Sequence, residues 1–148
     1  PQVLIDIANI IGRQSVVVVI DVKKSLFGSY DIYTHNGKKK IKKNLFEFII
    51  ELEAIGIGEL VINSIDNDGV MKGYDLSLAK KVRDSISIPL TVLGGAGHVD
   101  DILKLVEQHK VIGASAGSLF VFKGVYKAVL INYLQDSALS HIREISKT

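Results

Sequence analysis

The sequence of 148 residues contains no cysteine, so disulfide bonds, thiolate metal sites and thiol redox chemistry are all excluded. It also lacks any apolar run of the about 18–20 residues that a membrane-spanning helix requires. The apolar block Val16–Ile20 has the length of a strand and is followed at once by Asp21 and two lysines. We therefore expect a protein with no membrane partner, and the lack of cysteine fits a cytoplasmic location.

An excess of charge of one sign is missing as well, because 18 basic and 16 acidic residues leave a formal net charge of +2. This balance, without aromatic residues interleaved in a basic stripe, indicates no nucleic-acid partner. The four histidines are scattered and form neither an i, i+4 pair nor an HExxH motif. We expect no metal site and no cofactor, and no nucleophile elbow supports a hydrolytic triad.

The sequence does contain enough apolar material for one packed domain, with 47% hydrophobic and 23% charged residues. We expect a single domain over residues 1–148. The chain starts at Pro1 instead of methionine and opens directly on a helix-like stretch, Gln2–Gly12. It therefore looks like a piece of a longer protein.

Four short β-rich runs define the expected sheet, and each leads into polar or glycine-rich residues and then toward a helix-like stretch. The runs are Ser15–Ile20, Glu59–Ile62, Pro89–Leu93 and Val111–Ser115. The helical stretches that follow them are Leu45–Leu52, Leu76–Ser85, Val99–Gln108 and Val125–Leu134. Alternating strands and helices predict parallel strands whose ligands gather at the carboxyl ends.

One long insertion separates the first run from its helix. Tyr30–Thr34 alternates with period two and Asn36–Gly37 is a turn signal, which predicts a small hairpin that lies over the strand end, outside the core sheet. Lys38–Lys43 carries five lysines in six residues and is interpreted as a solvated loop that enters the helix. Neither segment is expected to contribute a core strand.

The number of strands separates two architectures. A closed (βα)8 TIM barrel needs about 250 residues, whereas four βα units of roughly 35–40 residues match this chain. An open, doubly wound sheet is the rival, but it usually has long hydrophobic helices on both faces and seldom has polar residues at every strand end. The pattern favours an α/β fold that covers about half of a (βα)8 barrel.

Asp21 follows the most hydrophobic run and is expected at the top of the barrel, where burial and nearby charge can tune a carboxylate for proton transfer. It is the best candidate for a general acid or base. The alternative is an aspartate that caps a helix or pairs with Lys23 or Lys24. Asp66 and Asp68 lack the further acidic ligands of a cation loop and are expected to form a turn.

Two glycine-containing loops, Gly94–Gly97 and Ala116–Ser118, follow neighbouring runs. Their backbone N–H groups, with the hydroxyl of Ser118, can cradle a phosphate at the carboxyl end of a barrel. A GGAG run alone also serves tight turns and is weak evidence. Two such loops together favour a phosphate site, with Asp68–Gly69 beside it. His98 is expected to cap the next helix or to face solvent.

Several motifs occur in the order found in the cyclase subunit of imidazole glycerol phosphate synthase. They are VIDVK (19–23), NGKK (36–39), NSIDNDG (63–69), KGYD (72–75) and the stretches 89–97 and 116–120. Over nearly all its length the chain resembles the carboxyl-terminal half of that (βα)8 barrel. SIDNDG followed by KGYD is the most specific piece, whereas GGAG alone would not discriminate among phosphate-binding barrels.

The resemblance implies a lyase-type cyclisation in histidine biosynthesis. In it a partner glutaminase releases ammonia, which passes through the barrel to a substrate with a phosphate at each end. Asp21 matches one of two aspartates that transfer protons, while the other aspartate and one phosphate site lie outside this sequence. The resemblance places the remaining phosphate site at Gly69, Gly94, Gly95, Gly117 and Ser118.

Three departures from the family pattern favour a second hypothesis. Asn36 and Asn63 stand where the family has small hydroxyl residues that face the substrate, and Leu93 stands where it usually has serine. Together with residues 120–127 and 129–133, they resemble paralogues found with surface-polysaccharide enzymes. Those paralogues imply ammonia delivery for the formation of acetamidino sugars, and therefore a different substrate.

A third hypothesis is a phosphate-binding half barrel without catalytic power, because one aspartate and one phosphate site are missing. Four βα units leave two sheet edges and one apolar face open, which favours pairing with a second copy. We therefore expect the isolated chain to be a homo-oligomer.

Overall fold

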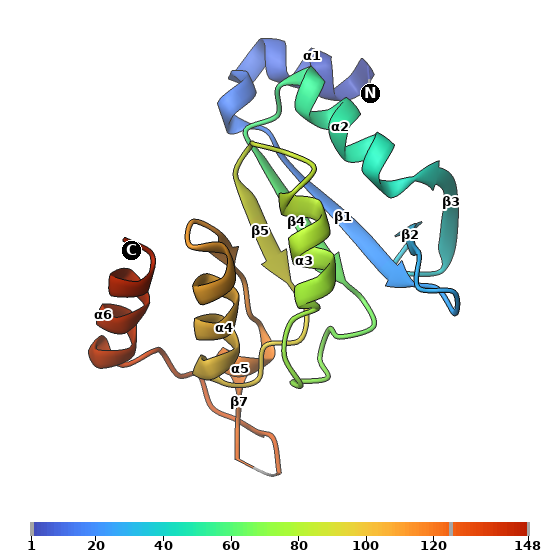
Figure 1. The fold of residues 1–148 in the computed structure, drawn as a ribbon. Helices are drawn as coiled ribbons and strands as arrows, with labels where there is room; N and C mark the ends of the chain where they lie inside the picture. Colours follow the sequence, from blue (N-terminus) through green and yellow to red (C-terminus); the bar gives the residue numbers. More distant parts are fainter. Residues whose placement is uncertain (1, 125, 148) are drawn as a thin grey trace.

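A computed structural model describes residues 2–124 and 126–147 (Figure 1). Its elements in chain order are helix α1 (Gln2–Ile11), the 3-10 helix η1 (Arg13–Ser15), strands β1 (Val17–Lys24), β2 (Tyr30–Thr34) and β3 (Lys39–Asn44), helix α2 (Leu45–Ile55), strand β4 (Glu59–Ser64), helix α3 (Leu76–Arg83), strand β5 (Leu90–Leu93), helix α4 (Val99–His109), strand β6 (Gly113–Ala114), helix α5 (Ser118–Val121), strands β7 (Phe122–Lys123) and β8 (Ala128–Val129), and helix α6 (Asp136–Ile145). Within these described ranges, no helix is long and apolar enough to cross a membrane.

One six-stranded sheet, in the order β3-β2-β1-β4-β5-β6, organises the molecule (Figure 1). Strands β1, β4, β5 and β6 run parallel, β2 pairs antiparallel with β1, and β3 pairs antiparallel with β2. The sheet does not close on itself, and β7 and β8 form a separate hairpin. The fold is thus α/β with a parallel sheet, and it is a partial (βα)8 barrel.

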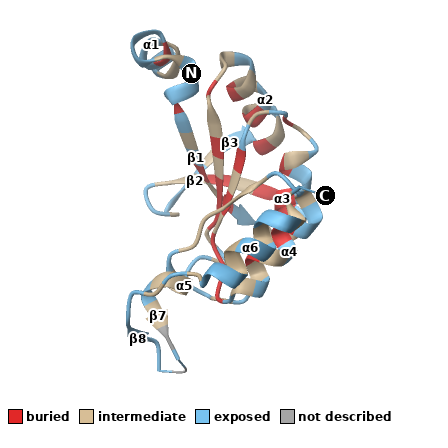
Figure 2. Cartoon of the chain, turned by 90° about the vertical axis from the view of Figure 1, so that its left-hand side faces the viewer, coloured by how far each residue is buried: buried red, intermediate tan, exposed pale blue. Residues whose placement is uncertain are grey.

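Helices α2, α3 and α4 lie on one side of the sheet, which we call the covered face (Figure 2). Leu60 and Ile62 of β4 and Val92 of β5 are buried there, with 0%, 0% and 1% of their surfaces exposed. They belong to one core cluster with Ile49 of α2 and Leu105 of α4. Each such side chain contributes roughly 1.5–3 kcal/mol when it is fully buried, so this face holds the fold together.

The opposite side, which we call the bare face, carries the alternate residues of the same strands. Val17 and Val19 of β1 are 51% and 58% exposed, whereas Ile20 and Val22 on the covered face are buried. Asp21 is the next residue after Val19 on the bare face. A half barrel leaves open the side that would form the barrel interior, and these valines lie on that side.

Strand β1 is longer than predicted, because β2 pairs with its last four residues and extends it to Lys24. Asp21 therefore lies inside the strand, and the prediction that it follows the strand end is wrong. The placement of the hairpin outside the core sheet is wrong as well. β2 is part of the main sheet, and its Tyr30 and Ile32 are buried.

The lysine-rich segment forms strand β3 at the sheet edge, so its interpretation as a loop is wrong, although its lysines are exposed as expected. Lysines on an edge strand oppose pairing with another chain. Asn44 ends β3 and caps α2, with its Oδ1 accepting from the N–H groups of Phe46 and Glu47 at 2.8 and 3.2 Å. Gly56, at φ 86° in the left-handed region, is the C-cap residue at which α2 ends.

The carboxyl-terminal elements differ most from the predictions. Strand β6 covers only two residues of the predicted run 111–115. The predicted helix Val125–Leu134 is wrong over 126–134, where the chain forms a turn, strand β8 and an irregular segment, while Val125 lies outside the described residues. Instead, the amide of Asn132 donates to the carbonyls of Leu119 and Phe120 and fastens the base of the β7–β8 hairpin. The last helix is α6, which packs against α4.

Candidate functional site

Two polar side chains of neighbouring parallel strands meet on the bare face. Asp21 of β1 and Asn63 of β4 are register partners, and the Asn63 Nδ2 donates to Asp21 Oδ1 at 2.9 Å. The carboxylate oxygen is the acceptor in this hydrogen bond, and the amide nitrogen is the donor. The amide therefore orients one oxygen of the predicted general acid or base.

Asn63 is buried, with 9% of its surface exposed. Its Oδ1 is buried without a hydrogen-bond partner and lies about 3.0 Å from the place where a side chain would begin at Gly94. Gly94 therefore lets β5 approach β4 where the amide packs. The prediction that Asn63 faces a substrate stays a prediction, and its contact with Asp21 is what the structure adds.

The segment after β4 is a turn over residues 65–70, as expected for Asp66 and Asp68. Asp66 also anchors this turn to β1, because its Oδ2 accepts from the Lys24 N–H at 2.8 Å and its Oδ1 lies 3.9 Å from Lys23 Nζ. Gly69 is exposed at φ 73°, with open space where a side chain would stand. Gly69 is thus an exposed residue at the carboxyl end of β4.

The two glycines that follow β5 have a structural reason to be glycine. Both have positive φ, 95° for Gly94 and 114° for Gly95. A Cβ at Gly94 would lie 2.5 Å from the Ser64 carbonyl oxygen, and one at Gly95 would lie 2.1 Å from that of Gly73. No side chain fits at these distances, so their packing alone accounts for both residues, and phosphate binding by them remains a prediction.

At the end of the same loop, two backbone N–H groups already donate hydrogen bonds within the protein. Asp101 Oδ2 accepts from the N–H groups of Gly97 and His98 at 2.9 and 3.0 Å. His98 is the N-cap residue of α4 and is exposed, as expected from its place before this helix. Any anion at this loop must therefore be bound by the donors before Gly97.

The loop after β6 adjoins these segments. The Ser115 N–H donates to the Val92 carbonyl at 2.9 Å, and the Ser115 carbonyl accepts from the Tyr74 hydroxyl at 2.9 Å. Gly117 is exposed with open space around it, and Ser118 begins α5. The structure thus brings the loops that follow β4, β5 and β6 to one end of the parallel sheet, as their strand order predicts.

Asn36 is the predicted site residue that lies apart. It occupies the β2–β3 turn, is exposed, and has a φ of 55°. A Cβ at the adjacent Gly37 would lie 3.1 Å from Ile65 Cδ1, so the turn approaches the segment after β4. Within the part of the chain that the structure describes, no hydrogen bond joins Asn36 to Asp21 or Asn63.

Sequence reasoning missed two buried tyrosines near this end of the sheet. Tyr74 bridges to Ser115, and Tyr30 of β2 donates to the Asp75 carboxylate, with distances of 3.2 and 3.0 Å to its two oxygens. Burial raises the pKa of both hydroxyls. Tyr74 and Asp75 are the last two residues of the KGYD motif, from which only the family resemblance was inferred.

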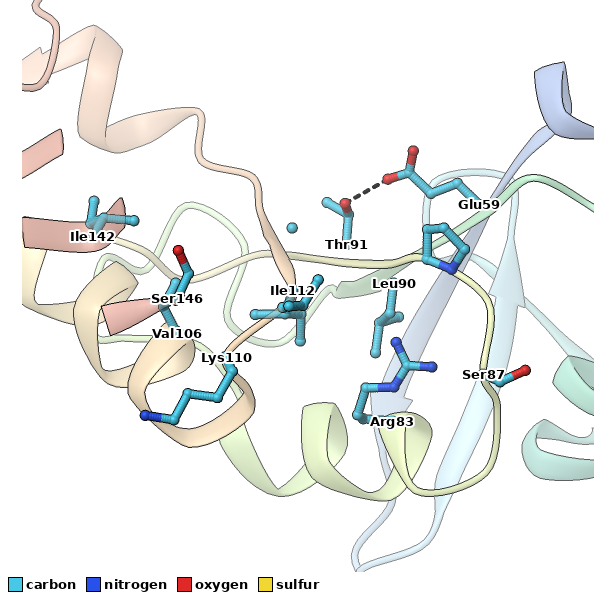
Figure 3. Close-up of a pocket in the computed structure, with 13 residues that line it drawn as sticks. Glu59, Arg83, Ser87, Leu90, Thr91, Val106, Lys110, Ile112, Ile142 and Ser146 are labelled. Carbon is cyan, nitrogen blue, oxygen red and sulfur yellow. Dashed lines mark hydrogen bonds between the residues drawn. The ribbon is translucent and has the colours of Figure 1, made fainter. Parts of the chain in front are cut away.

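A cavity of about 760 Å³ lies at the opposite end, where β4, β5 and β6 begin (Figure 3). In it Glu59 accepts a hydrogen bond from the Thr91 hydroxyl at 2.5 Å, and Lys110 and Arg83 contribute positive charge. This end of the sheet carries none of the predicted site residues. Over residues 2–124 and 126–147, no cluster of three or more His, Asp or Glu side chains could hold a metal.

Comparison with known proteins identifies the family. The family model described as "Histidine biosynthesis protein" matches residues 1–127. A Vibrio vulnificus protein named "Putative imidazole glycerol phosphate synthase subunit hisF3" is 58% identical over 138 residues, which are 93% of this chain and 53% of that protein. A Leptospira borgpetersenii protein, named as a putative HisF subunit of the same synthase, is 48% identical over 134 residues, 90% of this chain and 53% of its own.

A further relative carries the name without that qualifier. The Streptococcus sanguinis protein "Imidazole glycerol phosphate synthase subunit HisF" is 34% identical over 139 residues, which are 94% of this chain and 55% of that protein. The chain spans about half the length of these curated relatives. By its family match and these identities, the chain belongs to the histidine biosynthesis protein family.

Proposed function

We propose that this chain forms the carboxyl-terminal half of an ammonia-using cyclase barrel of the imidazole glycerol phosphate synthase type, a lyase of histidine biosynthesis. The observation that carries the proposal is the Asp21–Asn63 pair, which stands on the bare face beside the glycine loops. The names of the relatives support the same reading. A single domain over residues 1–148 and a cytoplasmic location are parts of the proposal.

In this mechanism Asp21 transfers a proton as general acid or base, and Asn63 keeps its carboxylate in place. Backbone N–H groups of the exposed residues Gly69 and Gly117, with the Ser118 hydroxyl, bind one phosphate of the substrate, and Gly94 and Gly95 shape the floor between them. A glutaminase partner supplies the ammonia. The second aspartate and second phosphate site belong to the half of the barrel that this sequence does not include.

The test compares Asp21→Asn with Asp84→Asn in a protein of the relatives' full length that carries this chain. Asp84 is a matched control, because its carboxylate is exposed and pairs with Lys80 on α3. Glutamine-dependent and ammonia-dependent turnover should fall about 10²–10⁴-fold for Asp21→Asn, the range typical of a lost general acid or base. Asp84→Asn should keep its turnover. Normal turnover of Asp21→Asn would exclude the proposed role.

A second candidate function is ammonia delivery for acetamidino-sugar formation in surface-polysaccharide biosynthesis. It is supported by Asn63, because a carboxamide offers a substrate different groups from the hydroxyl that the family pattern has at this position. Rescue of a histidine auxotroph by the full-length gene would count against this candidate, and failure of rescue with a stable protein would favour it.

For the isolated 148 residues we propose a catalytically inactive, phosphate-binding half barrel that associates with a second copy. The support is the bare face, where Val17 and Val19 are more than half exposed, and the free edge of β6. Apolar sheet surface of this kind marks an interaction site. A monomer in light scattering at micromolar concentration would contradict the association.

A further inference from the structure

Tyr74 makes a contact that neither the family assignment nor the proposed mechanism uses. Its side chain is 7% exposed, and its hydroxyl donates to the Ser115 carbonyl at 2.9 Å. This bond runs from the segment before α3 to the loop after β6, across 41 residues of sequence. Burial, with the charge of Asp101 as a smaller cause, raises the pKa of Tyr74 to about 12. The hydroxyl therefore stays a donor at every pH near neutrality.

Backbone hydrogen bonds of the residue before Tyr74 also connect the loop after β5 to this segment. The Gly73 N–H donates to the Gly95 carbonyl at 2.9 Å, and the Gly73 carbonyl accepts from Asn67 Nδ2 at 3.2 Å. Gly95 packs so closely on Gly73 that a Cβ would lie 2.1 Å from its carbonyl oxygen. Residues 73 and 74 thus connect the loops that follow β4, β5 and β6.

The loop after β6 depends on this connection more than the others do. Strand β6 has two residues and pairs with β5 only through Gly113 and Ala114. Beyond them, Ser115 is held by its N–H bond to Val92 and by the Tyr74 hydroxyl. Ser115 is three residues before Ser118 in the sequence, so a shift of its carbonyl moves the donors that follow. In catalysis, a misplacement of about 1 Å can cost about 10²-fold in rate, so the position of these donors matters to the site.

We propose that Tyr74 is a positioning residue that sets the distance between the Gly117–Ser118 loop and the loops after β4 and β5, and so fixes the affinity of the phosphate site. This inference rests on the proposed function, because it concerns the same phosphate. Tyr74 touches no substrate in this scheme. It acts through the Ser115 carbonyl.

The chain offers a matched control in Tyr30. It is also 7% exposed, and its hydroxyl also donates to a group on a distant segment, the Asp75 carboxylate, at 3.2 and 3.0 Å from its two oxygens. That bond ties β2 to the start of α3, where Asp75 caps the Leu78 N–H at 2.9 Å, and it does not reach the glycine loops. Tyr30→Phe and Tyr74→Phe therefore remove the same atom from equally buried sites, and only Tyr74→Phe frees the loop after β6.

The experiment titrates the 148-residue chain and both variants with inorganic phosphate, followed by amide NMR and calorimetry. Tyr74→Phe should weaken phosphate binding about tenfold, as expected for the loss of one hydrogen bond, and should shift the amide signals of Gly117 and Ser118 before phosphate is added. Tyr30→Phe should bind within about twofold of the wild type. In the full-length protein, Tyr74→Phe should raise KM about tenfold with kcat nearly unchanged.

Equal binding by wild type and Tyr74→Phe would overturn the inference and leave the proposed function intact. Equal weakening by Tyr30→Phe would also overturn it, because the effect would then be general. No binding by the wild type would instead overturn the phosphate site itself. If Tyr74→Phe does not fold in the isolated chain, the same variant in the full-length protein carries the test, and an unchanged KM there would contradict the inference.

Discussion

The two faces of the sheet differ in how deeply their residues are buried and in the residue types that they carry. On the covered face, alternate residues of β4 and β5 are fully buried under α2, α3 and α4. On the bare face, β1 presents the exposed Val17 and Val19, and β1 and β4 together present the Asp21–Asn63 pair. The first face supplies stability, and the second carries the proposed chemistry and the proposed surface for association. The proposed site thus lies where the barrel would be interior, on the face that the helices leave open.

The largest expected effect is on the covered face. Ile62→Ala removes a fully buried side chain from the core, and should lower the free energy of unfolding by about 2–5 kcal/mol. Val19→Ala, on the bare face at 58% exposure, should change it by less than about 0.5 kcal/mol in the monomer. Urea denaturation of both variants measures the difference. Similar losses would show that the two faces are not energetically distinct.

Two glycines of the site should differ in how much stability the protein loses when each is replaced by alanine. Gly95→Ala puts a Cβ against the Gly73 carbonyl at a φ of 114°, and should cost about 2–4 kcal/mol of stability. Gly69→Ala, at φ 73° in open space, should cost about 1 kcal/mol from backbone strain alone. Thermal unfolding compares them. A larger loss for Gly69→Ala would contradict the structural role assigned to Gly95.

The bare face can be tested through association. Val17→Lys combined with Val19→Lys places two charges on the exposed sheet surface, and should convert an oligomer into a monomer. Ile10→Lys in α1, at a residue that is 83% exposed, is the control and should leave the oligomer intact. Light scattering reports the mass. An oligomer that survives in the double variant would show that another surface forms it.

The smallest effect concerns acid stability on the covered side. Hydrogen bonds from Ser87 hold the pKa of Glu53 below its usual range, with a further bond from Ile88. A carboxylate with a lowered pKa stabilises the fold above the unfolded pKa, near 4.5, and loses that contribution as the pH falls through the folded value. Glu53→Gln should flatten this loss in urea titrations below about pH 4.5. An unchanged pH dependence would exclude the contribution.

Local sequence patterns predicted the elements that form local contacts. The strands around Leu60 and Val92 and the helices α2, α3 and α4 are confirmed, because their apolar periodicity matches one buried face. Their strand order then placed the three loops at one end of the sheet. The lysine-rich strand β3 and the extension of β1 past Asp21 were not predictable in this way, because both depend on antiparallel pairing with β2.

The site was predictable only in part for a similar reason. Asp21 and Asn63 could be singled out by type and position, but their hydrogen bond follows from the β1–β4 register. Tyr74 was singled out only as part of the KGYD motif, and its bond to Ser115 joins segments 41 residues apart. The apolar residues after β7 resembled a helix, whereas Asn132 fastens them as a hairpin.

The most direct test of the account is an amide NMR titration of the 148-residue chain with inorganic phosphate. The account predicts signal changes at the carboxyl ends of the strands, centred on Gly69, Gly117 and Ser118, with little change around the cavity at the amino ends. Changes centred instead on Arg83 and Lys110, which line that cavity, would place the anion at the wrong end of the sheet and contradict the account.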